Sequence, residues 1–149
     1  MKSFKRITLV AAAMLLASGC ASVPLADQAA DAEAKKFTVP MDKASVYVFR
    51  NESFGGAIKM PVTLNDRMMG DTGPKTYFHW LLDPGSYKIA SHTENTPELV
   101  VDVEAGKDYY VWQEVKMGLW TARSLLHKVD NTNGRKGVGE SRLIAEKPQ

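Results

Sequence analysis

The sequence predicts an all-β domain over residues 37–149: a small antiparallel β-sandwich of about seven strands, immunoglobulin- or prealbumin-like. Short apolar runs alternate with clusters of Gly, Pro, Asn and Asp along this region, as strands alternate with turns. The single cysteine lies before the region, so the stability of the domain has to come from packing. Strands of this length bury a core best as two sheets packed face to face; a small closed barrel is the alternative.

The first strand is expected at residues 44–50, where β-branched and aromatic residues occupy both faces and indicate cover on both sides. Residues 51–56 end it. A second run at residues 60–64 leads into Asn65-Asp66, two residues that tolerate left-handed backbone. This pair predicts a tight hairpin turn into residues 67–70.

Two further hairpins are predicted from turn residues that join apolar runs. Residues 77–82 and 86–91 are joined by Asp83-Pro84-Gly85, in which proline presets one corner of a turn and glycine suits the next. Residues 99–104 and 109–115 are joined in the same way across residues 105–108, with alternating inner and outer positions in the first of the two runs.

The C-terminal part is less regular. Residues 117–129 fit either another strand or a short helical element, and periodicity alone does not separate the two. Residues 131–139 are polar and contain glycine, which predicts a loop. Residues 140–145 form a last short element.

A targeting segment precedes the domain. The charged start contains Lys2, Lys5 and Arg6, and the apolar run after it is too short for a permanent membrane span. Small residues up to Gly19 come directly before Cys20, the only cysteine. This order resembles a bacterial lipoprotein signal, which implies a signal peptide over residues 1–19, cleavage between Gly19 and Cys20, and acyl chains on Cys20.

Residues 20–36 are expected to be the lipidated N-terminus and a tether. The stretch is rich in alanine and small polar residues and has no aromatic residue, so it accepts a helix only if something docks against it. Ala21 and Ser22 follow the cysteine where an inner-membrane retention signal would place Asp. The resemblance therefore implies the periplasmic face of the outer membrane.

The charge of the mature chain excludes some partners. Removal of residues 1–19 takes away three basic residues and no acidic one, so Lys+Arg falls from 19 to 16 against 17 Asp+Glu. The formal net charge changes from +2 to −1. A nearly neutral domain has no electrostatic footprint for nucleic acid and no polybasic patch for anionic lipid. The partners that remain are the membrane, through the lipid, and an envelope protein or glycan.

No residue pattern predicts catalysis or a cofactor. His79, His92 and His127 lack the Cys, His or acidic neighbours of a metal site, although His79 and His92 flank the same predicted hairpin. Ser141 follows a single glycine and lacks the second glycine of a nucleophile elbow. We therefore expect no enzyme, no metal and no cofactor, with an enzyme or metal protein whose site forms only in the fold as the alternative.

Aromatic residues provide the one candidate binding surface. Adjacent strand residues face opposite ways, so one of Tyr109 and Tyr110 must point away from the main core. An outward row of Tyr110 and Trp112 beside His79 is the candidate surface, although core packing is the favoured interpretation of aromatic residues in strands.

Four segments in order resemble one bacterial family: residues 46–50, the turn at Asn65-Asp66, residues 82–87 and residues 104–111. The sequence is similar to uncharacterised bacterial lipoproteins whose domain is labelled domain of unknown function 2846. The resemblance implies an envelope β domain and assigns no catalytic or binding residues.

Overall fold

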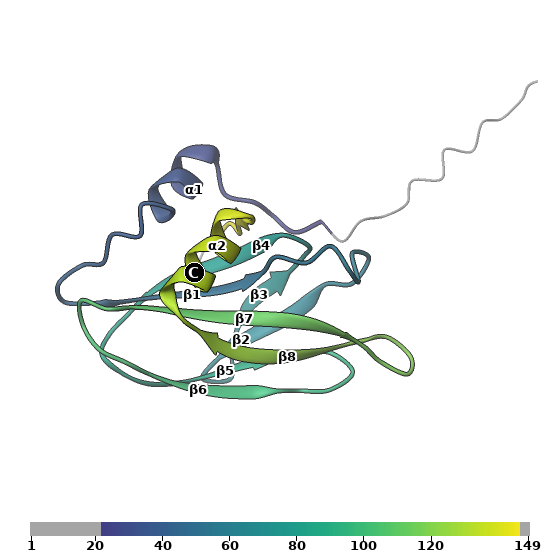
Figure 1. Cartoon of the computed structure of the whole chain (residues 1–149). Helices are drawn as coiled ribbons and strands as arrows, with labels where there is room; N and C mark the ends of the chain where they lie inside the picture. The colour runs from purple at the N-terminus through teal and green to yellow at the C-terminus, as the bar shows by residue number, and fades with distance from the viewer. Residues whose placement is uncertain (1–21, 147–149) are drawn as a thin grey trace, which may run out of the picture.

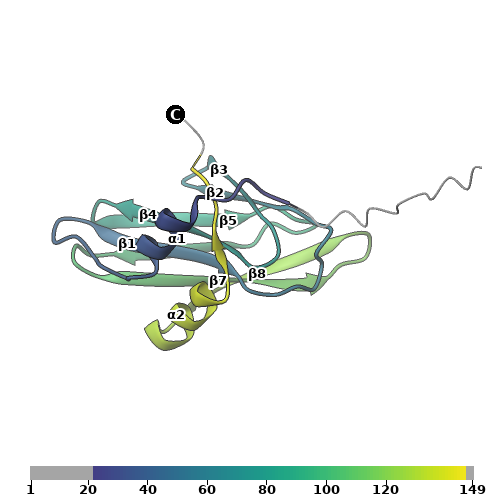
Figure 2. The ribbon, with the colours of Figure 1, turned by 90° about the horizontal axis from the view of Figure 1, so that it is seen from above.

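The computed structural model describes residues 22–146, which form two β-sheets facing each other and two helices (Figure 1). Helices α1 (Gln28–Ala34) and α2 (Asn131–Gly139) both cover the outer face of the larger sheet (Figures 1 and 2). The predicted all-β fold with two packed sheets is confirmed, and a helix near the C-terminus is present. In the described part of the chain, no helix is long and apolar enough to cross a membrane.

Within residues 22–146, nine strands build the two sheets. The five-stranded sheet has the order β8-β7-β1-β4-β9 and contains β1 (Ala44–Arg50), β4 (Thr76–Leu82), β7 (Asp108–Met117), β8 (Ala122–Val129) and β9 (Arg142–Leu143). The four-stranded sheet has the order β3-β2-β5-β6 and contains β2 (Met60–Leu64), β3 (Arg67–Thr72), β5 (Gly85–Ser91) and β6 (Glu98–Val103). The main core lies between them and includes Val48, Val62 and Val101, each at most 1% exposed.

The larger sheet is mixed, which differs from the antiparallel arrangement expected from the sequence. Strand β1 pairs with β4 in the antiparallel sense but with β7 in the parallel sense, and β9 is parallel to β4. Parallel neighbours need a crossover between them, and here the smaller sheet supplies it. The chain leaves β1, builds strands in both sheets, and returns beside β1 as β7.

One predicted hairpin is confirmed. Strands β2 and β3 pair across Asn65 and Asp66, whose φ angles are 48° and 65°. Positive φ at both central residues is the geometry of a two-residue hairpin turn whose twist matches that of the strands. The Asn65 side chain also accepts a hydrogen bond from the Lys88 backbone N–H at 2.8 Å, which ties the turn to β5.

Two predicted hairpins are wrong. Strands β4 and β5 lie in different sheets, and so do β6 and β7. The pairs that do form are β5 with β6 and β7 with β8. Pro84 and Gly85 redirect the chain as expected, but into the opposite sheet, and the φ of 159° at Gly85 is close to extended backbone. Turn residues therefore predict where the chain changes direction, but not which strands pair with each other.

The C-terminal region is a strand followed by a helix. The structure resolves the open choice at residues 117–129, because β8 is a strand that pairs with β7 along its whole length. Residues 131–139 form α2 and not the predicted loop. Asp130 caps the helix by accepting from Asn133 N–H at 2.9 Å. Glycines lower helix propensity, and for this reason the sequence predicts a loop. In the structure Gly134 and Gly137 let α2 pack closely against Tyr110 and Phe49.

The segment predicted as a tether is docked on the domain over its described part. Helix α1 is capped by Asp27, and Ala34 at its end is only 7% exposed. Leu25 forms an antiparallel bridge with Ile144, so the folded unit begins well before residue 37. Gly19 and Cys20, with the predicted signal peptide, lie outside the described residues.

Candidate functional site

The predicted aromatic surface is the floor of a second core. Tyr110 and His79 do lie on the outer face of the larger sheet, with Tyr47 between them in register. The Tyr47 ring is stacked on both, with centroids 4.4 Å from His79 and 5.1 Å from Tyr110. Tyr110 and Tyr47 are both 0% exposed because Phe37 and α2 cover them. The predicted outward direction of the row is confirmed, but the prediction that Tyr110 lies on the surface is wrong, because the helical cover was not foreseen.

The tyrosine hydroxyls of this outer cluster tie the helical segments to the sheet. Tyr47 donates to the Ala34 carbonyl at 2.8 Å, and Tyr77 donates to the Asp31 carboxylate at 2.9 Å, both in α1. Tyr110 donates to Asp108 at 2.7 Å. Burial raises the pKa of all three phenols above the ordinary value. The hydroxyls therefore act as structural donors.

His79 and Trp112 occupy the margins of the outer cluster. His79 is hydrogen-bonded through its ring to the Ser45 hydroxyl at 2.7 Å, and burial lowers its pKa. Trp112 lines a polar cleft of about 500 Å³ against α2, and its indole N–H has no hydrogen-bond partner among the described residues. Of the predicted row, Trp112 alone borders a cleft.

The histidines do not converge. His79 lies on the outer face of the larger sheet, whereas His92 follows β5 and contacts the Thr63 hydroxyl at 3.0 Å. His127 contacts the Glu114 carboxylate at 2.8 Å. Within residues 22–146, no group of three or more His, Cys, Asp or Glu side chains is placed to hold a metal ion.

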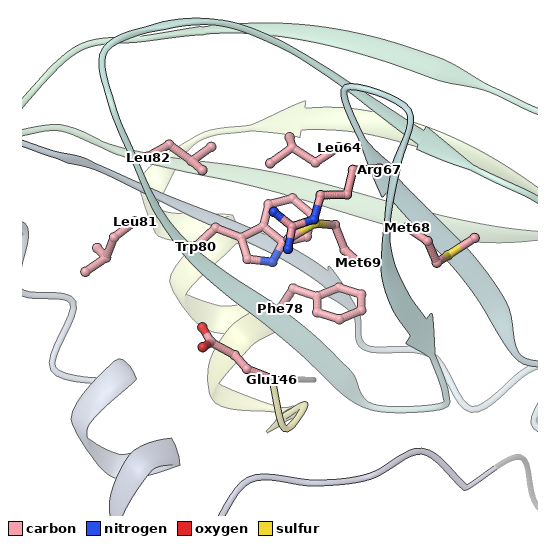
Figure 3. Close-up of a pocket in the computed structure, with 9 residues that line it drawn as sticks. All are labelled: Leu64, Arg67, Met68, Met69, Phe78, Trp80, Leu81, Leu82 and Glu146. Atoms are coloured by element: carbon pink, nitrogen blue, oxygen red, sulfur yellow. The ribbon is translucent and has the colours of Figure 1, made fainter. Parts of the chain in front are cut away.

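An apolar groove opens on the other side of the same sheet, between β4 and the β2–β3 hairpin (Figure 3). Its volume is about 300 Å³. The lining combines apolar side chains with one basic and one acidic residue: Leu64, Arg67, Met68, Met69, Phe78, Trp80, Leu81, Leu82 and Glu146. We call this the inter-sheet groove.

Strand alternation and the hairpin turn build the inter-sheet groove. Phe78 and Trp80 flank His79 in β4 and therefore face the opposite way, with their rings stacked at 5.4 Å between centroids. Gly70 makes room for them, since a Cβ at this position would lie 3.3 Å from the Phe78 ring. The tight turn after Leu64 brings Met68 and Met69 to the other wall.

The rim of the groove is apolar with a charge on either side. Met68 and Leu81 are 51% and 50% exposed, so the apolar lining continues onto the surface. Arg67 and Glu146 are both exposed at the rim. Arg67 forms no ion pair with a described residue, and its guanidinium is available to an acidic group on a partner. The expectation that Trp80 is a core residue is confirmed, since it is 6% exposed. The groove beside it was missed, and the signal for it was the Met68-Met69 pair next to a tight turn.

Comparison with protein families and curated proteins gives two matches. Residues 40–124 match the family described as protein of unknown function (DUF2846). An uncharacterized protein of Haemophilus influenzae is 29% identical over 139 residues, covering 92% of this chain and 82% of the relative. The family match spans β1 to the start of β8 and includes both walls of the inter-sheet groove. The chain belongs to the DUF2846 family, as the resemblance in its strand and turn segments led us to expect.

Proposed function

We propose that this protein is a lipid-anchored envelope protein, held at the periplasmic face of the outer membrane, that binds another envelope protein without catalysis. The observation that carries the proposal is the inter-sheet groove, with the stacked rings of Phe78 and Trp80 at its base and exposed apolar residues at its rim. The groove receives one or two large apolar side chains of the partner. Arg67 pairs with a neighbouring acidic residue.

The size and lining of the groove favour a protein partner. A volume of about 300 Å³ is at the lower end for sites that enclose a small molecule but suits anchor side chains at a protein interface. Trp and Arg are the residues that most often dominate binding energy at such interfaces. Methionine adapts its shape to different apolar partners, and Met68 and Met69 form one wall.

The lipid anchor rests on the sequence around Cys20. Each buried CH₂ of an acyl chain contributes about 0.8 kcal/mol, so several chains on one cysteine give essentially permanent attachment. Ala21 and Ser22 are compatible with export to the outer membrane. The match to the DUF2846 family is compatible with an outer-membrane location and is not part of the argument for it.

Site-specific photo-crosslinking in intact cells tests the groove. A photoreactive residue at position 68 should give one discrete protein adduct, and the same residue at exposed Met41 should not give it. Leu81→Glu should abolish the adduct because it places a charge on the apolar rim. Val100→Glu is the matched control on the edge strand β6, where Val100 is 61% exposed. An adduct unaffected by Leu81→Glu would contradict the groove as the binding site.

Two substitutions test the anchor and the address separately. Cys20→Ala should abolish lipidation and normal processing, whereas Ala21→Asp should leave lipidation intact and hold the protein at the inner membrane. Fractionation by membrane density distinguishes these results. A parent protein found chiefly in inner-membrane fractions would contradict the outer-membrane location but not the lipidation of Cys20.

A further inference from the structure

The end of the β7–β8 hairpin carries three of the four most exposed large apolar side chains of the described chain. Met117, Leu119 and Trp120 are 78%, 84% and 92% exposed. We call residues 117–121 the β7–β8 tip. Solitary exposed apolar residues are ordinary, but three within four positions at the end of a projecting hairpin indicate a contact surface.

Glu94 holds the tip in one conformation. Its carboxylate accepts hydrogen bonds from the backbone N–H groups of Leu119, Trp120 and Thr121, at 3.0, 2.8 and 3.0 Å. These bonds, led by the one from Trp120, lower the pKa of Glu94 to about 2, so the Glu94 carboxylate is ionised at neutral pH. Gly118 permits the tight turn, because a Cβ there would lie 2.1 Å from the Thr121 carbonyl oxygen.

The base of the tip is braced as well. Asn95 makes two hydrogen bonds with the backbone of Ser124, at 2.8 and 3.0 Å, and Glu52 accepts from Val115 N–H at 2.8 Å. A rigid loop loses little conformational freedom when it binds, so its exposed side chains contribute more of their apolar burial to affinity.

Figures 1 and 2 place the tip and the start of the described chain at the same end of the sandwich. Both lie toward the right of each view, where the coloured ribbon begins at residue 22 and where β7 turns back into β8. Two peptide units separate Cys20 from Ser22, which limits their Cα atoms to at most about 7 Å apart. A membrane that holds Cys20 therefore lies at the tip's end of the domain.

Two basic side chains lie at the base of the tip. Lys116 and Arg123 are exposed and directly opposite each other in the β7–β8 register. Lys116 pairs with Glu114 and Arg123 lies near the Glu94 carboxylate, so the base is not strongly basic, and contact with lipid has to come chiefly from the apolar side chains of the tip. Trp, with an apolar body and a polar N–H, is suited to the boundary between headgroups and acyl chains.

We propose that the β7–β8 tip inserts Leu119 and Trp120 into the interface of the bilayer that carries the lipid anchor, giving the domain a second contact that fixes its orientation. The inference rests on the proposed anchor at Cys20 for the choice of membrane. It leaves the inter-sheet groove, on a different part of the fold, free to bind its partner.

Quenching of tryptophan fluorescence tests the insertion. The lipidated mature protein is reconstituted in phosphatidylethanolamine–phosphatidylglycerol vesicles with bromine atoms at a shallow position of the acyl chains. Trp120 should be quenched, and Trp120→Phe should remove the quenched fraction, because Trp80 is 6% exposed and Trp112 is half-buried. Equal quenching of parent and Trp120→Phe, or none in either, would overturn the proposal. The latter result would leave the tip in water or against a protein.

A second measurement separates failure of the tip from failure of the anchor. Mass spectrometry of the mature protein shows whether Cys20 is lipidated, independently of Trp120. The unlipidated Cys20→Ser mature chain is then sedimented with the same vesicles at low salt. Trp120→Ala should weaken its partitioning on the order of tenfold. Met41→Ala should not change it, because Met41 is 90% exposed in the segment before β1, which is bonded through Lys43 to the β6–β7 turn. Partitioning that both variants leave unchanged would overturn the proposal even if Cys20 is lipidated.

Discussion

The aromatic clusters on the two faces of the five-stranded sheet are both buried but differ in what lies beside them. On the outer face Tyr47 and Tyr110 stack beneath the helical cover and are fully buried. On the inner face Phe78 and Trp80 stack as closely, but the smaller sheet stands off from them and leaves the inter-sheet groove. Aromatic content alone therefore does not identify a binding surface. What covers the rings decides it.

The polar atoms of the two clusters account for the difference. Tyrosine hydroxyls on the outer face bond to α1 and to Asp108, which in turn pairs with Arg135 of α2 at 2.9 Å. Each bond draws a helical segment onto the sheet and also satisfies a buried group. Phe78 has no such atom, and its neighbours across the groove are flexible methionines. The outer face, closed by specific bonds, is the closed face; the inner face, which borders the inter-sheet groove, is the open face.

The largest expected effect comes from forcing the closed face open. Gly134→Ala would place a Cβ at 2.1 Å from the base of the Tyr110 ring, so α2 has to move away. We expect a loss of unfolding free energy of about 1–3 kcal/mol despite the better helix propensity of alanine. Chemical denaturation of the mature chain measures it.

Gly139→Ala is the matched control at the end of the same helix. A Cβ at this position meets no atom within 4 Å, so the substitution should be neutral or stabilising by up to about 1 kcal/mol. Equal effects of the two substitutions would mean that α2 does not pack on Tyr110, and the outer face would then be the open one.

A smaller effect is expected from removing one hydroxyl of the closed face. Tyr47→Phe deletes the buried hydrogen bond to the Ala34 carbonyl and should cost about 0.5–1.5 kcal/mol. Tyr87→Phe removes an exposed bond to the Asp83 carbonyl and should cost less. Thermal unfolding of the two variants ranks them. A larger loss of stability in Tyr87→Phe than in Tyr47→Phe would show that the Tyr47 hydroxyl does not hold α1 on the sheet.

The sequence predicted strands well and their partners poorly. The Asn65-Asp66 turn allows one geometry, so that hairpin followed from two residues. The reversals at Pro84-Gly85 and Gly106 pass between sheets, and nothing local distinguishes such a crossing from a hairpin. Helix α2 was missed for a related reason: its glycines serve contacts with Phe49 and Tyr110, which are distant in the chain.

The candidate sites, too, could be predicted from the sequence only where local residues determine them. Alternation along β7 predicted that Tyr110 faces away from the main core, but its cover comes from Phe37 and α2, both more than twenty positions away in the chain. The inter-sheet groove joins β4 to a hairpin in the other sheet, so it required the three-dimensional pairing. The β7–β8 tip was visible only as apolar residues next to Gly118.

The acid dependence of stability gives the smallest effect on the closed face. Burial would raise the pKa of Asp31, but hydrogen bonds from Lys35, the Leu143 N–H and Tyr77 outweigh it and hold the pKa below 3.8. The stabilisation from Asp31 is therefore present above about pH 4 and is lost as the pH falls through the lower folded value. The difference in unfolding free energy between parent and Asp31→Asn should shrink from about pH 7 to about pH 3. A difference that stays constant over this range would show that Asp31 does not bind the cluster as a carboxylate.

The most direct test of the open and closed faces uses the methionine methyl groups as probes. The mature chain has Met68 and Met69 at the groove, Met60 in the core, Met117 at the tip and Met41 in the exposed segment before β1. NMR spectra of methyl-labelled protein are recorded while a small apolar alcohol such as 1-octanol is added. The account predicts saturable shifts of the Met68 and Met69 signals, with Met60, Met41 and the rings of Tyr47 and Tyr110 unchanged. Shifts of the Tyr47 and Tyr110 rings, with Met68 and Met69 unmoved, would contradict it.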